Sequence, residues 1–177
     1  MNSINRRSFI ASTGLIGAAL ATASPLAAAA NCAPKHGLTK EKFLAYIDAF
    51  NNDKYDQFGD YYDEKVVLVI AGKTELVGHQ AIFDFYKSVK TQTRRTIEVN
   101  KLIITDRLLA AELQSEFLAL EDAPDFTAGP MKKGGRIFIN TFVLYHLSET
   151  GKFVLIRSAE FNKIDRQLEN QDAKQPA

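Results

Sequence analysis

Cysteine is almost absent from this 177-residue sequence: Cys32 is the only one, so no disulfide can form within the chain. An excess of one charge is also missing, because 22 Lys and Arg residues face 21 Asp and Glu residues. A balanced surface gives no electrostatic reason to bind nucleic acid, and we expect no such partner. The 3 histidines lack metal-ligand spacing, and the sequence has no Gly-x-Ser-x-Gly, phosphate-binding or dinucleotide-binding motif. We therefore expect neither a metal nor a cofactor.

A long hydrophobic run is missing as well, even near the N-terminus. Two arginines, Arg6 and Arg7, precede a weakly apolar stretch over residues 11–23 that Ser, Thr and Gly interrupt. This stretch is too short and too polar to span about 30 Å of hydrocarbon, so we expect no stable membrane insertion. Residues 1–30 resemble a bacterial twin-arginine export signal, with an ordinary secretory signal as the alternative. We expect a periplasmic or secreted protein, with a linker at residues 31–38.

The hydrophobic pattern changes once along the chain, from helical to alternating. Phe43, Tyr46, Ile47 and Phe50 fall at i, i+3, i+4 and i+7, which indicates one apolar stripe of a helix. Beyond residue 95, long alternating runs are typical of strands. This order predicts an α+β domain over residues 39–164, with a curved sheet around N-terminal helices. We expect helices at about 40–50, 55–62 and 80–89, strands at 66–70, 75–77, 96–105, 108–120, 136–147 and 153–164, and a polar tail at 165–177.

Three segments carry a resemblance to a known family. They read Tyr-Ile-Asp-Ala-Phe-Asn at residues 46–51, Tyr-Asp-Glu-Lys-Val-Val at 62–67, and Gly-His-Gln-Ala-Ile-Phe-Asp-Phe-Tyr at 78–86. The chain resembles the polyketide cyclase (SnoaL-like) branch of the nuclear transport factor 2-like superfamily. The resemblance implies a cone-shaped, strongly curved, mostly antiparallel sheet with three N-terminal helices closing a pocket, and a homodimer formed through the outer face of the sheet. Relatives include isomerases, cyclases, dehydratases, epoxide hydrolases, lyases and non-catalytic domains, so the fold does not choose the reaction.

Ketosteroid isomerase, a relative in that superfamily, gives the sharpest comparison for a site. The resemblance places its oxyanion-hole tyrosine at Tyr46, where a phenol in a dry pocket would stabilise an enolate or phenolate oxygen. The alternative is a core tyrosine whose hydroxyl meets a backbone carbonyl. The second oxyanion donor falls near Asn140. The general-base aspartate falls at about Val69 or Ile70, both apolar, so the isomerase mechanism loses its base.

A base must then come from another strand. Alternation along residues 108–120 puts Glu112 and Gln114 on one face. Composition alone sends that face to water, whereas matching to the isomerase sends it into the cone. In the second case Glu112 would suit proton abstraction and Gln114 would line the pocket. By the same alternation Ser158 and Glu160 share a face of the last strand, and Glu160 is a second candidate base.

One histidine and several aromatic residues complete the candidate site. His79 begins the third predicted helix, where a rim or capping residue is the alternative to a proton-transfer role at the pocket mouth. The rings of Phe50, Tyr62, Phe85 and Phe142 would suit an aromatic or polycyclic guest.

These patterns predict a cofactor-independent acid–base enzyme of the lyase, isomerase or dehydratase type. Its substrate would be a small hydrophobic molecule that carries a ring. Tyr46, with Asn140, would polarise an oxygen of that molecule, and a glutamate or His79 would move a proton. The alternative is a non-catalytic periplasmic domain that binds small molecules or supports assembly, which the missing base in the first strand favours.

Overall fold

The computed structural model describes residues 37–167, which belong to one unit of the chain. The predicted export signal at residues 1–30 lies outside these described residues. So do most of the predicted linker and residues 168–177 of the predicted tail. No helix within residues 37–167 is long and apolar enough to cross a membrane.

The helices come from the first half of the described chain. They are α1 (Lys40–Asn51), α2 (Tyr55–Gly59) and α3 (Gly78–Gln92). α1 begins after Thr39, whose hydroxyl accepts a hydrogen bond from the backbone N–H of Lys42 at 3.3 Å. The apolar stripe predicted for α1 is buried along its whole length. The prediction of a second helix reaching residue 62 is wrong at its end, because Tyr62 begins a strand.

The strands form one six-stranded sheet. They are β1 (Tyr62–Ile70), β2 (Thr74–Val77), β3 (Thr93–Ile104), β4 (Leu108–Ala119), β5 (Arg136–Leu147) and β6 (Phe153–Arg166). Their order is β2-β1-β6-β5-β4-β3, and each neighbouring pair is antiparallel except β1 with β6. The predicted α+β class and mostly antiparallel sheet are confirmed. β6 runs on to Arg166, so the residues predicted to begin the tail are part of a strand.

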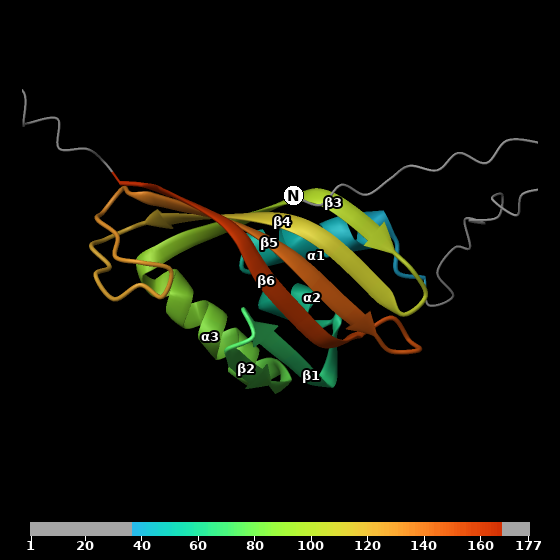
Figure 1. Ribbon diagram of the computed structural model, residues 1–177. Coiled ribbons are helices and arrows are strands. Elements are labelled where there is room, and N and C mark those ends of the chain that lie inside the picture. Colours follow the sequence, from blue (N-terminus) through green and yellow to red (C-terminus); the bar gives the residue numbers. More distant parts are fainter. Residues whose placement is uncertain (1–36, 168–177) are drawn as a thin grey trace, which may run out of the picture. The chain divides into compact units, whose positions relative to one another are not determined.

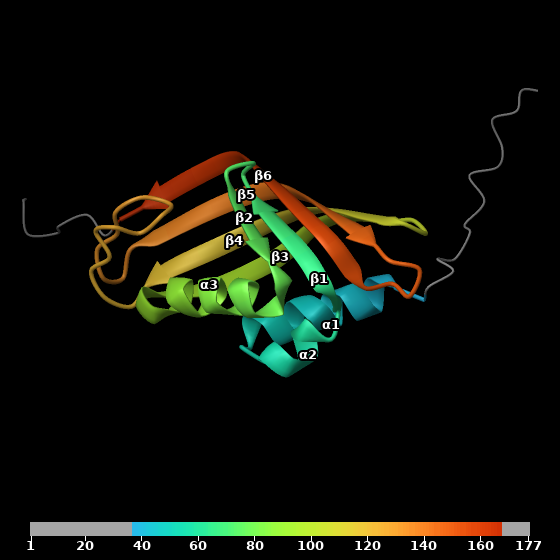
Figure 2. The same cartoon turned by 90° about the horizontal axis from the view of Figure 1, so that it is seen from below.

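The three helices lie together on one face of the strongly curved sheet (Figures 1 and 2). Aromatic rings fill the space between the two layers: the ring of Tyr46 in α1, for example, packs edge-on against Phe153 in β6, with 5.2 Å between centroids. Asn51 fixes the end of α1 to β3. Its side chain accepts a hydrogen bond from the backbone N–H of Ile97 at 2.8 Å and donates one to the same residue's carbonyl at 2.9 Å. The helix is therefore held against the sheet at both an apolar and a polar contact.

Two of the β-bulges in the sheet, one in β3 and one in β6, decide which nearby side chains face the helices. Asn100 is the extra residue of β3 opposite β4, and Phe161 is the extra residue of β6 opposite β5. Because side chains alternate along a strand, one extra residue reverses the alternation beyond it. In β6, Ser158 and Glu160 come before the reversal and face the helices, whereas Asn162 comes after it and pairs with the outward-facing Asn140.

Candidate active-site pocket

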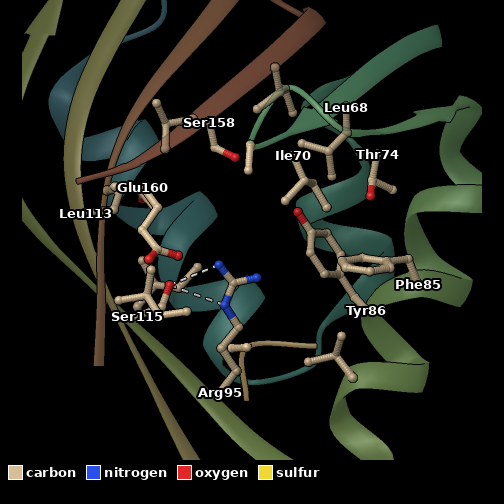
Figure 3. A pocket seen from close by; sticks show the side chains of 18 of the residues that line it. Leu68, Ile70, Thr74, Phe85, Tyr86, Arg95, Leu113, Ser115, Ser158 and Glu160 are labelled. Carbon is tan, nitrogen blue, oxygen red and sulfur yellow. Dashed lines mark hydrogen bonds between the residues drawn. The ribbon is translucent and has the colours of Figure 1, made fainter. Parts of the chain in front are cut away.

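A cavity of about 390 Å³ opens between the inner face of the sheet and helices α1 and α3 (Figure 3). This size is typical of sites for small molecules. Most of the wall is apolar or aromatic, with Phe50 from α1, Phe85 from α3 and Ile156 from β6 among its side chains. The charged groups in the wall are few. They are Lys73, Arg95 and Glu160.

Five of the site residues predicted from the sequence lie in this wall. They are Tyr46, Phe50, Phe85, Ser158 and Glu160. Glu160 is the only carboxylate among the described residues that line the cavity, and its side chain remains exposed to solvent at the pocket. Figure 3 shows Glu160 and Tyr86 reaching into the cavity from opposite walls. A carboxylate and a phenol thus share one largely apolar space.

The even-numbered face of β4 lies outside the pocket, so its proposed entry into the cone is wrong. The wall is built instead from the odd residues Leu113, Ser115 and Phe117, which are buried. Glu112 faces the other side of the sheet, where its carboxylate accepts a hydrogen bond from the Asn100 side chain at 3.3 Å. The comparison with the isomerase therefore gave the wrong face of this strand. The composition alone, which assigned the even-numbered face to water, gave the right one.

Three further predicted site residues also lie away from the cavity. Gln114 pairs in register with Asn140, and the Asn140 side chain accepts a hydrogen bond from Asn162 at 3.3 Å on the outer face. Although Asn140 lies on the outer face, it is only 8% exposed, because neighbouring side chains cover it. Phe142 is 52% exposed and stacks on Phe161, with 4.3 Å between ring centroids. None of the three can touch a molecule held in the pocket.

His79 serves the local structure at the start of α3. Its Nε2 lies 2.9 Å from the backbone carbonyl of Asp63. A carbonyl only accepts, so Nε2 carries the proton and donates it. The ring also packs edge-on against Tyr62, and His79 is not part of the cavity wall. His79 therefore ties the start of α3 to β1, and it neither caps the helix nor lines the pocket.

The hydroxyl of Tyr46 meets the hydroxyl of Tyr62 at 3.1 Å, and both rings are buried. Tyr62 lies behind Tyr46 rather than in the wall. Burial, together with the neighbouring tyrosines, raises the pKa of Tyr46 well above its ordinary value of 10.0, and burial does the same to Tyr62 and Tyr145. These phenols keep their protons at neutral pH, and in the Tyr46–Tyr62 pair one hydroxyl donates to the other. The alternative of a backbone carbonyl partner for Tyr46 does not occur in the described hydrogen bonds.

Arg95 is one of the pocket residues that the sequence prediction missed, as are Tyr86 and Lys73. Its Nε and one Nη donate to the Ser115 hydroxyl at 3.3 and 2.9 Å. The predicted strand began at residue 96, three residues after the start of β3 at Thr93, and so left Arg95 out. Extending the alternation of Ile97 back by two residues would have placed Arg95 on the inner face.

The chemistry available to this pocket comes from its own side chains. Among residues 37–167, no group of three or more His, Cys, Asp or Glu side chains could hold a metal ion. Among the described residues, the wall combines one carboxylate, one guanidinium, one ammonium group and several hydroxyls with a larger number of apolar and aromatic side chains. Such a set can accept a proton, donate hydrogen bonds to a developing negative charge and exclude bulk water.

The chain belongs to the SnoaL-like domain family, whose match covers residues 43–156. This confirms the resemblance on which the cone was predicted. Among the curated proteins, no relative matches the sequence.

Solved structures share the fold at low sequence identity. The epoxide hydrolase/cyclase-like enzyme SalBIII, which has a role in pyran ring formation in the polyether salinomycin, is 22% identical, with a TM-score of 0.56 over 69% of this chain and 89% of its own. A SnoaL-like polyketide cyclase from Agrobacterium tumefaciens is 19% identical, with a TM-score of 0.54 over 73% and 92% of the two chains. An LEH-like epoxide hydrolase from M. tuberculosis is 10% identical, with a TM-score of 0.54 over 68% and 80%. These likenesses establish a nuclear transport factor 2-like cone.

Proposed function

We propose that the pocket binds a small hydrophobic, ring-bearing molecule and performs cofactor-independent acid–base chemistry of the lyase, isomerase or dehydratase type. The observation that carries the proposal is the position of Glu160, a single carboxylate in the wall of an aromatic cavity. The chain's similarity to proteins described as cyclases and epoxide hydrolases supports a reaction without a cofactor. It does not identify the substrate.

In this proposal Glu160 accepts a proton from a carbon or hydroxyl group of the bound molecule. Negative charge then develops on a carbonyl or phenol oxygen, and a tyrosine hydroxyl of the wall, Tyr46 or Tyr86, donates a hydrogen bond to it. Glu160 returns the proton to a different atom, which gives isomerisation, or to a leaving oxygen, which gives elimination. The hydroxyl of Tyr62 holds the hydroxyl of Tyr46 in place through their hydrogen bond.

A second candidate function is ligand binding without catalysis. The side chain of Ile70 lines the cavity at the place that the family resemblance assigns to the isomerase base. An apolar residue there cannot move a proton. If Glu160 is equally inactive, the same pocket is a binding site in a domain that carries or senses its ligand.

The test separates turnover from binding. The protein is heated with each member of a panel of ring ketones, phenols, terpenoids and lignin-like aromatics. A true ligand should raise the unfolding midpoint by several degrees, because a ligand at about 100 times its dissociation constant adds about 2.7 kcal/mol to the free energy of unfolding. For an uncharged hit that is also converted, Glu160→Gln should lower turnover by about 10² to 10⁴-fold and leave the dissociation constant unchanged.

Glu112→Gln is the matched control, because it makes the same change on the outer face of the sheet. This variant should leave both the turnover and the dissociation constant unchanged. Recovery of every hit unchanged from the wild-type protein would reject the enzyme and favour the binding domain. Equal turnover in wild type and Glu160→Gln would reject Glu160 as the base.

We further propose that the protein acts as a homodimer after export. The dimer is supported by apolar side chains exposed on the outer face of β5 and β6, which are Phe142, Leu144, Phe161 and Ile164.

The proposal of export rests on the arginine pair and the weakly apolar stretch that follows it. Replacing Arg6 and Arg7 together with lysine should retain the protein in the cytoplasmic fraction of a twin-arginine-competent bacterium, and periplasmic accumulation of that variant would contradict the route.

A further inference from the structure

Arg95 is a positive charge held inside an aromatic enclosure. The carbon of its guanidinium lies 5.2 Å from the ring centroid of Phe117, 5.3 Å from that of Phe50 and 5.8 Å from that of Tyr86. The side chain is only partly accessible to solvent. The ring faces attract the cation and fix its position, but they carry no net charge with which to neutralise it.

The polar partner of Arg95 is also neutral. Ser115 is 2% exposed, and its hydroxyl accepts from two of the five guanidinium N–H groups. Burial raises the pKa of the Tyr86 phenol, and the charge of Arg95 opposes that rise. None of the ion pairs formed within residues 37–167 includes Arg95, since no carboxylate comes within 4.0 Å of it.

A second arginine of the same sheet shows the contrast. Arg136 lies on the outer face and forms an ion pair with Glu116. Charges removed from water are normally paired, because the desolvation cost is otherwise uncompensated. Of these two arginines, the one without an ion pair faces the cavity.

We infer that Arg95 anchors a carboxylate group of the ligand, so that the pocket takes a ring-bearing carboxylic acid rather than a neutral ring compound. The inference rests on the proposed function in one respect, that the cavity is the site for a ring-bearing molecule. A guanidinium presents its donors as a planar fork that fits the two oxygens of a carboxylate. Lys73 adds a second positive charge in the cavity wall, whereas Glu160 is the only negative one.

The preference can be measured with two probes of equal size, 2-naphthoate and 2-naphthamide, which differ in the charge of one group. Titration calorimetry at low ionic strength gives both dissociation constants for the full-length protein. We expect the wild type to bind the carboxylate about tenfold or more tightly than the amide, the range for a hydrogen bond to a charged group. Arg95→Met should weaken 2-naphthoate by at least tenfold and change 2-naphthamide by no more than about twofold.

Arg136→Met is the matched control, because it removes an arginine from the outer face of the same sheet, and it should retain the preference. If Arg95→Met does not fold, Arg95→Lys decides the question, since it keeps the charge without the fork. We then expect 2-naphthoate to weaken several-fold and 2-naphthamide to be unaffected. An undiminished affinity of Arg95→Lys for 2-naphthoate would overturn the inference.

The outcomes distinguish this inference from the proposed function. Equal affinity of the wild type for the two probes overturns the carboxylate anchor and leaves a pocket for ring-bearing molecules standing. A preference that survives in Arg95→Met overturns the role of Arg95. Failure of both probes to bind the wild type overturns the anchor and the assignment of the cavity to ring-bearing ligands together.

Discussion

The hydrogen bond between Tyr46 and Tyr62 offers a direct test of how the pocket wall is supported. The two hydroxyls lie 3.1 Å apart, and the residues are 4% and 2% exposed. Tyr→Phe at either position removes one hydroxyl and leaves the other buried without this partner, at a cost of about 1–3 kcal/mol. The double replacement removes both hydroxyls, so neither one is left unsatisfied.

The free energies of unfolding should therefore not be additive. With each single variant about 1.5 kcal/mol less stable than wild type, we expect the double variant to lose about 2 kcal/mol rather than about 3 kcal/mol, which is a coupling of about 1 kcal/mol. Each single replacement should lower the unfolding midpoint by about 6 °C in a domain of this size. Urea unfolding followed by circular dichroism gives all four values of the cycle.

Tyr61→Phe is the control for this cycle. The ring of Tyr61 also packs against Tyr46, at 5.3 Å between centroids, but its side chain is only partly buried. We expect a change of less than about 0.5 kcal/mol, as for other surface substitutions. Losses at Tyr46 and Tyr62 that add to within about 0.3 kcal/mol would refute the reasoning, because independent sites add in that way.

Two other expectations concern alkaline stability and self-association. Burial raises the pKa of Tyr145 well above 10.0, so its contribution to stability is complete below pH 10 and is lost as the pH rises from there towards the folded-state pKa. Urea unfolding should show a falling free energy above pH 10 and a shallower fall in Tyr145→Phe, and identical slopes would contradict the burial argument. The proposed dimer predicts a sedimentation mass of two chains at micromolar concentration and dissociation by Phe142→Lys, whereas Leu44→Lys, at an exposed apolar position of α1, should not dissociate it. A wild-type mass of one chain would count against the dimer.

The fold was predictable because the spacing of apolar residues in each segment agrees with the helix or strand that the segment forms. The spacing of Phe43, Tyr46, Ile47 and Phe50 matches the buried stripe of α1, and the alternating runs after residue 95 match the long strands. The boundaries were less predictable. Tyr62 recurs at helical spacing after Phe58, yet it begins β1, because its backbone pairs with β6. Such pairing joins residues far apart in the sequence, and local periodicity does not contain it.

The candidate site was only partly predictable, because one residue of register exchanges the two faces of a strand. In β4 the burial of Leu113 and Phe117 decides the face, and the apolar composition of that face already indicated it. The comparison with ketosteroid isomerase reversed this choice and led to Glu112. Arg95 was missed because the strand was predicted to begin at residue 96, although β3 begins at Thr93.

The bulge at Phe161 decides where the side chains of β6 stop facing the pocket. Alternation from Ser158 to Glu160 holds up to the bulge, so Glu160 faces the pocket opposite Thr141 of β5. Immediately beyond the bulge, Asn140 pairs with Asn162 on the outer face. The extra residue therefore ends the pocket-facing series of β6 at its carboxylate and turns the ring of Phe161 outward. Alternation along β6 was enough to find Glu160, whereas Asn140 came from the comparison with ketosteroid isomerase, which placed it on the wrong face of β5.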